Sequence, residues 1–359
     1  MIFSKAGFGG AVADFEAAVV AQDAKRSGKA FIRLQETFGR AKETELFAGG
    51  PRLAAVLEQV PPSPRSVVAV LVGACVERGA DAERCAPGVL AGLRAALEGA
   101  VAFGEAWAAT GGGAFPVPDD GEPGEDIVER TGFEAAVGWW TLSQWEMAAV
   151  ALLNHRAVRA ALDGEAVRAG LDDATVHGQA GSGRGELLRL LTAVAQASGQ
   201  ELRCLSYALQ VLDDEPLVVL HRPTATGYLL RLSGIGDNFQ LHTLLADALI
   251  GGGHVAGRAP SPQEVAVCRE TPGQVETAGS FELVAPDGDR LWNEGTPADI
   301  PVVDGVRLLV LDEPSYARSW PAGRFFPGMR GDLILERALE PEETERWLAR
   351  VSPAGELTG

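Results

Sequence analysis

The residues that could do chemistry gather between positions 221 and 254. Three of the five histidines of the chain lie there, namely His221, His242 and His254. The same stretch contains the glycine-rich segment SGIGDNFQ at residues 233–240. A glycine-rich turn between a strand and a helix lets the backbone approach a ligand closely. The pattern therefore makes Gly234 and Gly236 candidates for ligand binding.

Two of these histidines could act together with a carboxylate. His221 ends a predicted strand, and His242 lies one turn into the helix that follows Asp237. Two histidines and one carboxylate can bind a metal ion or form an acid–base pair. The structural alternative is that Asp237 caps the helix with Gln240 as its capping-box partner, and that His242 is a buried core residue. The sequence leaves both interpretations open for His221, Asp237 and His242.

Arg184 is a further candidate ligand-binding residue. The segment GSGRGE at 181–186 is close to a dinucleotide-binding fingerprint, but Glu186 replaces its last glycine and no strand precedes it. One interpretation is a flexible loop before a helix. The other is an anion site, in which Arg184 and the N–H groups of the helix N-terminus hold a phosphate or a carboxylate.

The distribution of lysine excludes several chemistries. Of the 31 basic residues only four are lysines, at positions 5, 25, 29 and 42, so no lysine follows Lys42. A phosphate-binding loop and a Schiff-base enzyme both need a lysine, and no matching motif precedes position 43. The zinc-protease and serine-hydrolase signatures are also missing from the sequence. Whether the chain is an enzyme, and which cofactor it would use, stays undetermined.

The net charge disfavours nucleic acid as a partner. The chain carries a formal charge of −18, whereas phosphate backbones require a cationic surface. The charge is uneven along the sequence. Residues 1–50 contain seven basic and six acidic side chains, while residues 119–130 contain six acidic side chains and one arginine. An acidic run of this kind is typical of a solvated loop.

The first part of the chain is predicted to be helical. Apolar residues recur at helical spacing at about 11–27, and again through 51–109, 133–153 and 185–197. Residues 110–131, rich in glycine, proline and acidic side chains, are expected to form a mobile acidic loop. The tryptophans that follow are expected in the core, not in a ligand cage; they are Trp139, Trp140 and Trp145.

The period of the apolar residues changes near position 201. Three strands are predicted at 202–212, 216–221 and 227–232, followed by a helix at about 237–250. Ser261 opens a further helix with a capping box, and the Asp-Gly pairs at 287–288 and 304–305 predict hairpins. The fold class is therefore α+β: a helical domain at 1–200, then a mixed domain of antiparallel strands and helices at 201–359.

These features predict a cytoplasmic protein, and the arginine-for-lysine bias is typical of GC-rich bacterial genomes. The four cysteines show no metal-binding spacing, and the longest apolar run, 67–76, is too short for a membrane span. The helical first part and the lack of catalytic signatures favour a protein- or peptide-interaction domain, with self-association as a related option. The alternative is an enzyme or ligand-binding protein that uses residues 221–254, with or without a metal.

Overall fold

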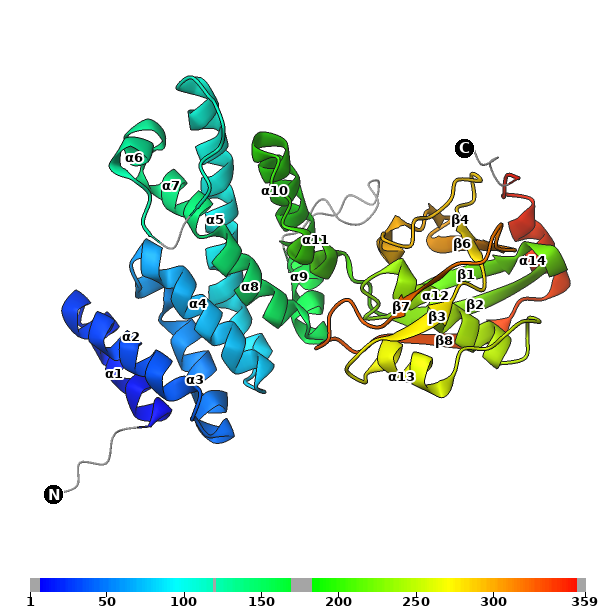
Figure 1. The fold of residues 1–359 in the computed structure, drawn as a ribbon, viewed down its shortest axis with the longest axis horizontal. Helices are drawn as coiled ribbons and strands as arrows, with labels where there is room; N and C mark the ends of the chain where they lie inside the picture. The colour runs from blue at the N-terminus through cyan, green and yellow to red at the C-terminus, as the bar shows by residue number, and fades with distance from the viewer. Residues whose placement is uncertain (1–6, 119–120, 169–182, 354–359) are drawn as a thin grey trace. The chain divides into compact units, whose positions relative to one another are not determined.

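The computed structural model describes residues 7–118, 121–168 and 183–353, and its contacts divide the chain into two compact units (Figure 1). The first unit, Met1–Leu209, is helical in its described part, and the second, Gln210–Gly359, combines strands and helices. The predicted α+β fold class is confirmed. Along the chain, the boundary between the units falls between Leu209 and Gln210. The sequence predicted the domain boundary after residue 200.

The helical unit is a succession of helices with short connections. In the described residues these are α1 (Phe8–Val20), α2 (Ala24–Phe38), α3 (Glu43–Ala55), the 3-10 turn η1 (Leu57–Gln59), α4 (Pro62–Glu77), α5 (Ala82–Ala109), α6 (Glu125–Thr131), α7 (Phe133–Trp140), α8 (Leu142–Leu153), α9 (Arg156–Arg168), α10 (Gly183–Ser198) and α11 (Arg203–Gln210).

The helix predicted at about 11–27 is two helices in the structure. The chain turns at Gln22, which adopts a positive φ of 53°. Asp23 then caps α2, because its side chain accepts the backbone N–H of Arg26 at 2.9 Å. The apolar spacing of the first helix predicted its buried side correctly, with Phe15 and Val19 in the core. The helix boundary was missed because both helices are amphipathic and follow each other closely.

Helix α5 forms the centre of the helical unit, where it packs against α7 and α8. The crossing with α7 is close, since a Cβ added to Gly138 would lie 2.8 Å from the Cα of Gly99. Among the described helices, α5 alone is long and apolar enough to cross a membrane by length and composition. The core helix of a soluble protein passes the same test, and α5 buries Leu93, Leu97 and Phe103.

An aromatic cluster joins α5, α7 and the segment between them. The rings of Phe103 and Trp139 stack with centroids 5.7 Å apart, and the Trp139 indole N–H donates to the Pro116 carbonyl at 3.0 Å. The predicted core role of the tryptophans is confirmed, since Trp139, Trp140 and Trp145 are buried. Segment 110–131, in which no regular structure was predicted, contains α6, and Arg130 lies 3.4 Å above the Trp107 ring. Residues 119–120 of this segment lie outside the described residues.

The α/β unit contains a six-stranded mixed sheet and a two-stranded ribbon. The large sheet has the order β4 (Glu282–Val284), β6 (Val306–Asp312), β1 (Glu215–His221), β2 (Thr226–Ser233) and β8 (Asp332–Ala338), with β5 (Val302–Val303) also paired to β6. The ribbon consists of β3 (Val275–Ala278) and β7 (Ser319–Ala322). Strands β1 and β6 run parallel, and the other pairs in both sheets are antiparallel.

Strand β1 is apolar on both sides because helices cover both faces of the sheet. Leu217 and Val219 point to a core that contains α12 (Asn238–Ala246). Val218 and Leu220 point to a second cluster, against which Trp347 of α14 (Pro341–Leu348) packs. A strand buried on both faces reads as a continuous apolar run instead of an alternating one.

Several local signals place the remaining elements as predicted. The hairpin at Asp304-Gly305 joins β5 to β6. Its two turn residues have positive φ values of 51° and 82°, a conformation that Asp-Gly pairs adopt readily. Ser261 caps α13 (Pro262–Arg269) through a capping box with Glu264. Helix α12 continues into a π-helical turn, η3 (Asp247–Gly251). Two further 3-10 turns are η2 (Arg222–Thr224) and η4 (Pro297–Asp299).

One predicted strand is wrong. Residues 203–210, within the predicted strand 202–212, form helix α11. Leu205, Ala208 and Leu209 are buried, so the apolar residues recur at helical spacing. A short apolar run is ambiguous between strand and helix, and packing decides between them here.

Candidate functional site

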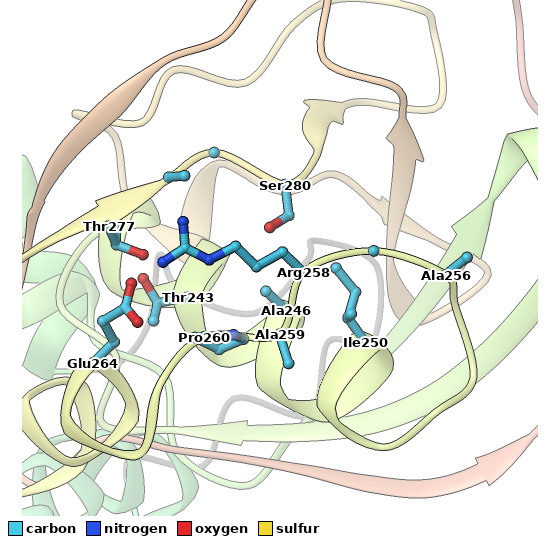
Figure 2. A pocket seen from close by; sticks show the side chains of 13 residues that line it. Thr243, Ala246, Ile250, Ala256, Arg258, Ala259, Pro260, Glu264, Thr277 and Ser280 are labelled. Atoms are coloured by element: carbon cyan, nitrogen blue, oxygen red, sulfur yellow. The ribbon is translucent and has the colours of Figure 1, made fainter.

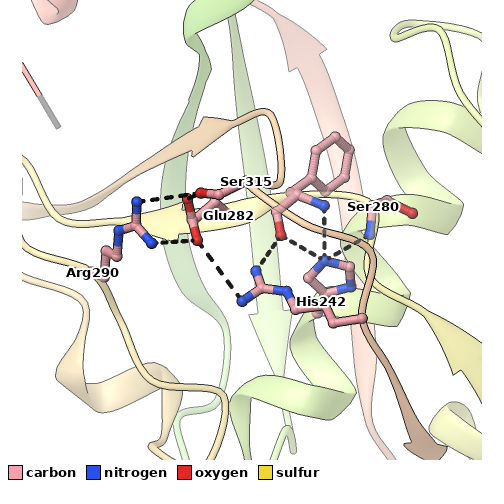
Figure 3. Close-up of polar contacts among 7 residues, drawn as sticks. His242, Ser280, Glu282, Arg290 and Ser315 are labelled. Carbon is pink, nitrogen blue, oxygen red and sulfur yellow. Dashed lines mark hydrogen bonds and ion pairs between the residues drawn. The ribbon is translucent and has the colours of Figure 1, made fainter. Parts of the chain in front are cut away.

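His242 is fully buried, and its ring is used to hold the backbone of the neighbouring segment. Its Nε2 atom accepts the N–H groups of Ser280 at 3.1 Å and Phe281 at 3.0 Å (Figure 3). The carbonyl oxygen of Phe281 also lies 3.2 Å from Nε2, but an atom that accepts two N–H groups carries no proton to donate. We therefore assign the ring proton to Nδ1.

The surroundings of His242 keep its imidazole neutral. Burial, together with the nearby positive charge of Arg318, lowers its pKa from 6.5 to about 4, although the Phe281 carbonyl opposes this shift. While its Nε2 lone pair accepts two N–H groups, the ring cannot bind a metal through that atom, and it takes up a proton there only by losing both hydrogen bonds. The structure places His242 in the core, where its Nδ1 is buried without a hydrogen-bond partner among the described residues, and the metal or acid–base role stays a prediction.

The other two candidates for a metal or acid–base site also have local partners. His221 lies at the end of β1, with Nδ1 2.7 Å from the Thr224 hydroxyl, and burial lowers its pKa against the charges of Asp312 and Glu313. Asp237 caps α12 by accepting the Gln240 N–H at 2.8 Å. The Phe281 ring contacts both His221 and His242. No group of three His, Cys, Asp or Glu side chains that could hold a metal ion occurs in the described residues.

The glycines of segment 233–240 approach another part of the protein. Gly234 has a φ of 65°, and a Cβ there would lie 2.0 Å from the carbonyl oxygen of Arg330. A Cβ on Gly236 would lie 3.0 Å from the Cβ of Phe325. The close approach that a glycine-rich turn permits is therefore filled by the segment before β8, and not by an open ligand space.

Arg184 lies at the start of α10 with its guanidinium buried in the helical unit. It donates to the carbonyl of Leu209 at 3.1 Å and to the Asp163 carboxylate at 2.7 Å. Its relative exposure is 5%, so the side chain joins neighbouring helices instead of facing a solvent-accessible anion. Gly181 and Ser182, the first two residues of the GSGRGE segment, lie outside the described residues.

A buried carboxylate network lies beside His242. Glu282 pairs with Arg290 at 2.9 Å and accepts the Ser315 hydroxyl at 2.9 Å (Figure 3). Arg318 lies 3.9 Å from the same carboxylate and donates to the Phe281 carbonyl at 2.8 Å. This network holds β4 and the chain before β7 in fixed positions around Phe281. Both oxygens of the Glu282 carboxylate have partners in this network, whereas Arg318 Nε is buried without a hydrogen-bond partner among the described residues.

A polar cleft opens next to this network in the α/β unit. It encloses about 180 Å³ and includes Thr243, Arg258, Glu264, Thr277 and Ser280 in its lining, and we call it the Arg258 cleft (Figure 2). Part of it comes from the stretch that the sequence singled out, since Thr243 and Ile250 lie within 221–254. Arg258 and Glu264, six residues apart in the sequence, were missed as site residues because they belong to no recognisable motif.

A second cavity lies in the helical unit between α1, α2 and the start of α4. It encloses about 470 Å³ and is mainly apolar, with Phe15, Val19, Phe31, Val60 and Val68 in its lining; we call it the α1–α2 groove. Gly28 faces it from the middle of α2, and a Cβ there would meet nothing within 4 Å. A glycine inside a helix lowers the stability of the helix. Here the missing side chain leaves space open at this point of the groove.

Helix α2 lines the α1–α2 groove with small and apolar residues and carries its basic side chains elsewhere on its surface, while the charged residues in the lining are Glu58 and Arg65. The helix carries four basic side chains and one acidic side chain, although the whole chain has a net charge of −18. The basic side chains are exposed, and they are Lys25, Arg26, Lys29 and Arg33. Of these, Arg33 pairs with Asp14 at 2.7 Å. Two of the four lysines, Lys25 and Lys29, therefore lie on a helix that contributes to the groove, but neither of them lines it.

Comparison with known proteins adds no assignment to either cavity. No family model, no curated protein and no solved structure matches this chain.

Proposed function

We propose that the helical unit is a protein-interaction module, which binds an apolar and acidic segment of a partner protein in the α1–α2 groove. The observation that carries the proposal is the combination of an apolar cavity of about 470 Å³ with the cationic helix α2 that lines part of it. Apolar grooves between helices receive the apolar side of a partner segment, and their charged borders select its register and sign.

The lining of the groove suits side-chain anchors better than a small polar molecule. Phe15 and Val19 come from α1, Phe31 from α2, and Val60 and Val68 from the chain around the start of α4. Each fully buried aliphatic or aromatic side chain contributes about 1.5–3 kcal/mol relative to exposure. Several such anchors are needed to offset the cost of association, which is about 4–15 kcal/mol.

The basic side chains elsewhere on α2 favour a partner segment that carries acidic side chains outside its apolar anchors. Lys25, Arg26 and Lys29 are exposed on α2, and Lys25 and Lys29 have no ion pair among the described residues. Charges outside an apolar contact act mainly on the rate of encounter and on partner choice. The chain as a whole is acidic, which favours a protein partner over a nucleic acid.

Peptide selection tests this function. Random peptides displayed on phage are selected on the full-length protein, and the selected sequences are then synthesised and measured by fluorescence anisotropy. The expected peptides share apolar residues at helical or alternating spacing, with Asp or Glu beside them. Replacing those acidic residues with Lys is expected to weaken binding by at least about tenfold at low salt. A selection that enriches no peptides, or peptides that tolerate the change to Lys, would contradict the proposal.

A further inference from the structure

We propose that the Arg258 cleft of the α/β unit binds a small α-amino acid through its free ammonium and carboxylate groups. This inference is independent of the α1–α2 groove, because it rests on different residues in the other unit. The cleft includes one cationic and one anionic side chain, Arg258 and Glu264, together with the hydroxyls of Thr243, Thr277 and Ser280 (Figure 2).

The floor of the Arg258 cleft carries a fixed negative charge. Glu264 is 6% exposed, and one carboxylate oxygen accepts the Ser261 N–H at 2.5 Å. Burial raises the pKa of Glu264. Hydrogen bonds with Ser261 and Thr277 and the charge of Arg258 together lower the pKa by a larger amount, so the net shift is downward. The group is therefore ionised at neutral pH. It is an acceptor that an ammonium group can use.

The opposite charge comes from Arg258, which acts on Glu264 through its charge and not through a direct hydrogen bond or ion pair between these two described residues. Arg258 is exposed and extends across the cleft toward Thr243 (Figure 2). In the described part of the chain it makes no hydrogen bond and no ion pair within 4.0 Å. A guanidinium presents paired N–H groups that match the geometry of a carboxylate.

The charges of the cleft select against ligands of a single sign. A simple anion that reaches Arg258 also meets the carboxylate of Glu264, and a simple cation that reaches Glu264 also meets the guanidinium of Arg258. A zwitterion satisfies both charges at once. An α-amino acid is the smallest common ligand that carries an ammonium and a carboxylate on one carbon atom.

The size and the walls of the cleft narrow the ligand further. A volume of about 180 Å³ is below the roughly 300–1,000 Å³ of pockets for drug-sized ligands, which favours a small ligand. The side walls are formed in part by Ala246, Ile250 and Pro260. These apolar groups favour a short aliphatic side chain over a charged one, and L-valine is the probe of choice.

Isothermal titration calorimetry of the full-length protein tests the proposal with three probes. L-valine carries both charges, N-acetyl-L-valine lacks the ammonium, and L-valinamide lacks the carboxylate. We expect L-valine to bind and each derivative to bind at least about tenfold more weakly. No heat with L-valine at millimolar concentration, or equal affinity for all three probes, would overturn the proposal.

Two variants assign the charges to residues. Glu264→Gln keeps an oxygen that can cap α13, and we expect it to weaken L-valine binding by at least about tenfold, as Arg258→Gln should. Arg330→Gln is the matched control, since Arg330 is exposed outside the cleft. Wild-type affinity in both cleft variants would overturn the assignment. The three probes need no variant, so the proposal remains testable even if Glu264→Gln fails to fold.

Discussion

The imidazole of His242 accepts the backbone N–H of Ser280 at 3.1 Å, and Ser280 lines the Arg258 cleft. A histidine of the core therefore fixes one wall of a surface cleft. The bond requires the unprotonated Nε2 atom, because a protonated imidazole has no lone pair to accept an N–H group. The position of this wall is thus linked to the protonation state of a residue that water does not reach.

The stability of the α/β unit should depend on pH through His242. Its pKa is about 4 in the folded state and 6.5 ordinarily, so the unfolded chain takes up the proton first as the pH falls. The stabilisation is complete above pH 6.5 and is lost as the pH falls through the folded-state pKa. We expect a loss of about 3 kcal/mol between these limits, measured by urea unfolding at a series of pH values.

The control for this prediction uses two histidine variants. His242→Gln removes the titrating group and should flatten the pH dependence in this window, at some cost in overall stability. The same replacement at His254, whose side chain is exposed, is the comparison. A profile that His242→Gln leaves as steep as in the wild type would show that other groups carry the effect.

Gly234 should not tolerate a side chain. Alanine at a positive φ costs about 1 kcal/mol in the backbone, and contact with the Arg330 carbonyl should add at least about 2 kcal/mol. Gly253→Ala separates the two terms, because Gly253 also has a positive φ of 75° but has nothing within 4 Å of an added Cβ. Chemical denaturation of both variants measures the difference. Equal losses in the two variants would mean that the segment before β8 moves aside freely.

Arg184 should contribute to the stability of the helical unit and not to anion binding. Arg184→Ala leaves the Leu209 carbonyl without its donor, and we expect a loss of at least about 2 kcal/mol in the free energy of unfolding. Arg189→Ala, at an exposed position of α10, should change it by less than about 0.5 kcal/mol. Thermal unfolding with and without inorganic phosphate is the second measurement. Stabilisation by phosphate that disappears in Arg184→Ala would restore the anion-site interpretation.

The four cysteines should differ sharply in reactivity. Burial raises the pKa of the thiols of Cys75 and Cys85 to about 12 and that of Cys268 to about 11, whereas Cys204 is exposed. Since the thiolate is the reactive form, iodoacetamide at pH 7.5 should label Cys204 first in the native protein. Peptide mass spectrometry identifies the modified residues. Rapid labelling of Cys268 in the folded protein would contradict the burial described here.

The sequence predicted those elements whose signals are local. The capping box at Ser261 and the turn at Asp304-Gly305 each depend on a few neighbouring residues, and both were found. Helix α11 was missed because its apolar run is short and its spacing ambiguous. Strand β8 was missed because it pairs with β2, about a hundred residues earlier in the chain, and no local signal reports such pairing.

The candidate sites were harder to predict for the same reason. The histidines drew attention to residues 221–254, and the structural alternative for His242 describes its position better than the metal site does. Arg258 and Glu264 lie six residues apart but belong to no recognisable motif, so the sequence did not indicate the cleft that they line. The α1–α2 groove has one local signal in the sequence, which is Gly28 inside α2. This residue has no side chain that could extend into the groove.

The most direct test of the proposed function is to replace Gly28 with leucine, whose side chain would extend into the α1–α2 groove. The affinity of a selected peptide is measured by fluorescence anisotropy for the wild type, Gly28→Leu and Gly39→Leu. Gly39 ends the same helix, also has nothing within 4 Å of an added Cβ, and does not line the groove. We predict at least about a tenfold loss in Gly28→Leu and wild-type affinity in Gly39→Leu. Unchanged affinity in Gly28→Leu would contradict binding in the groove.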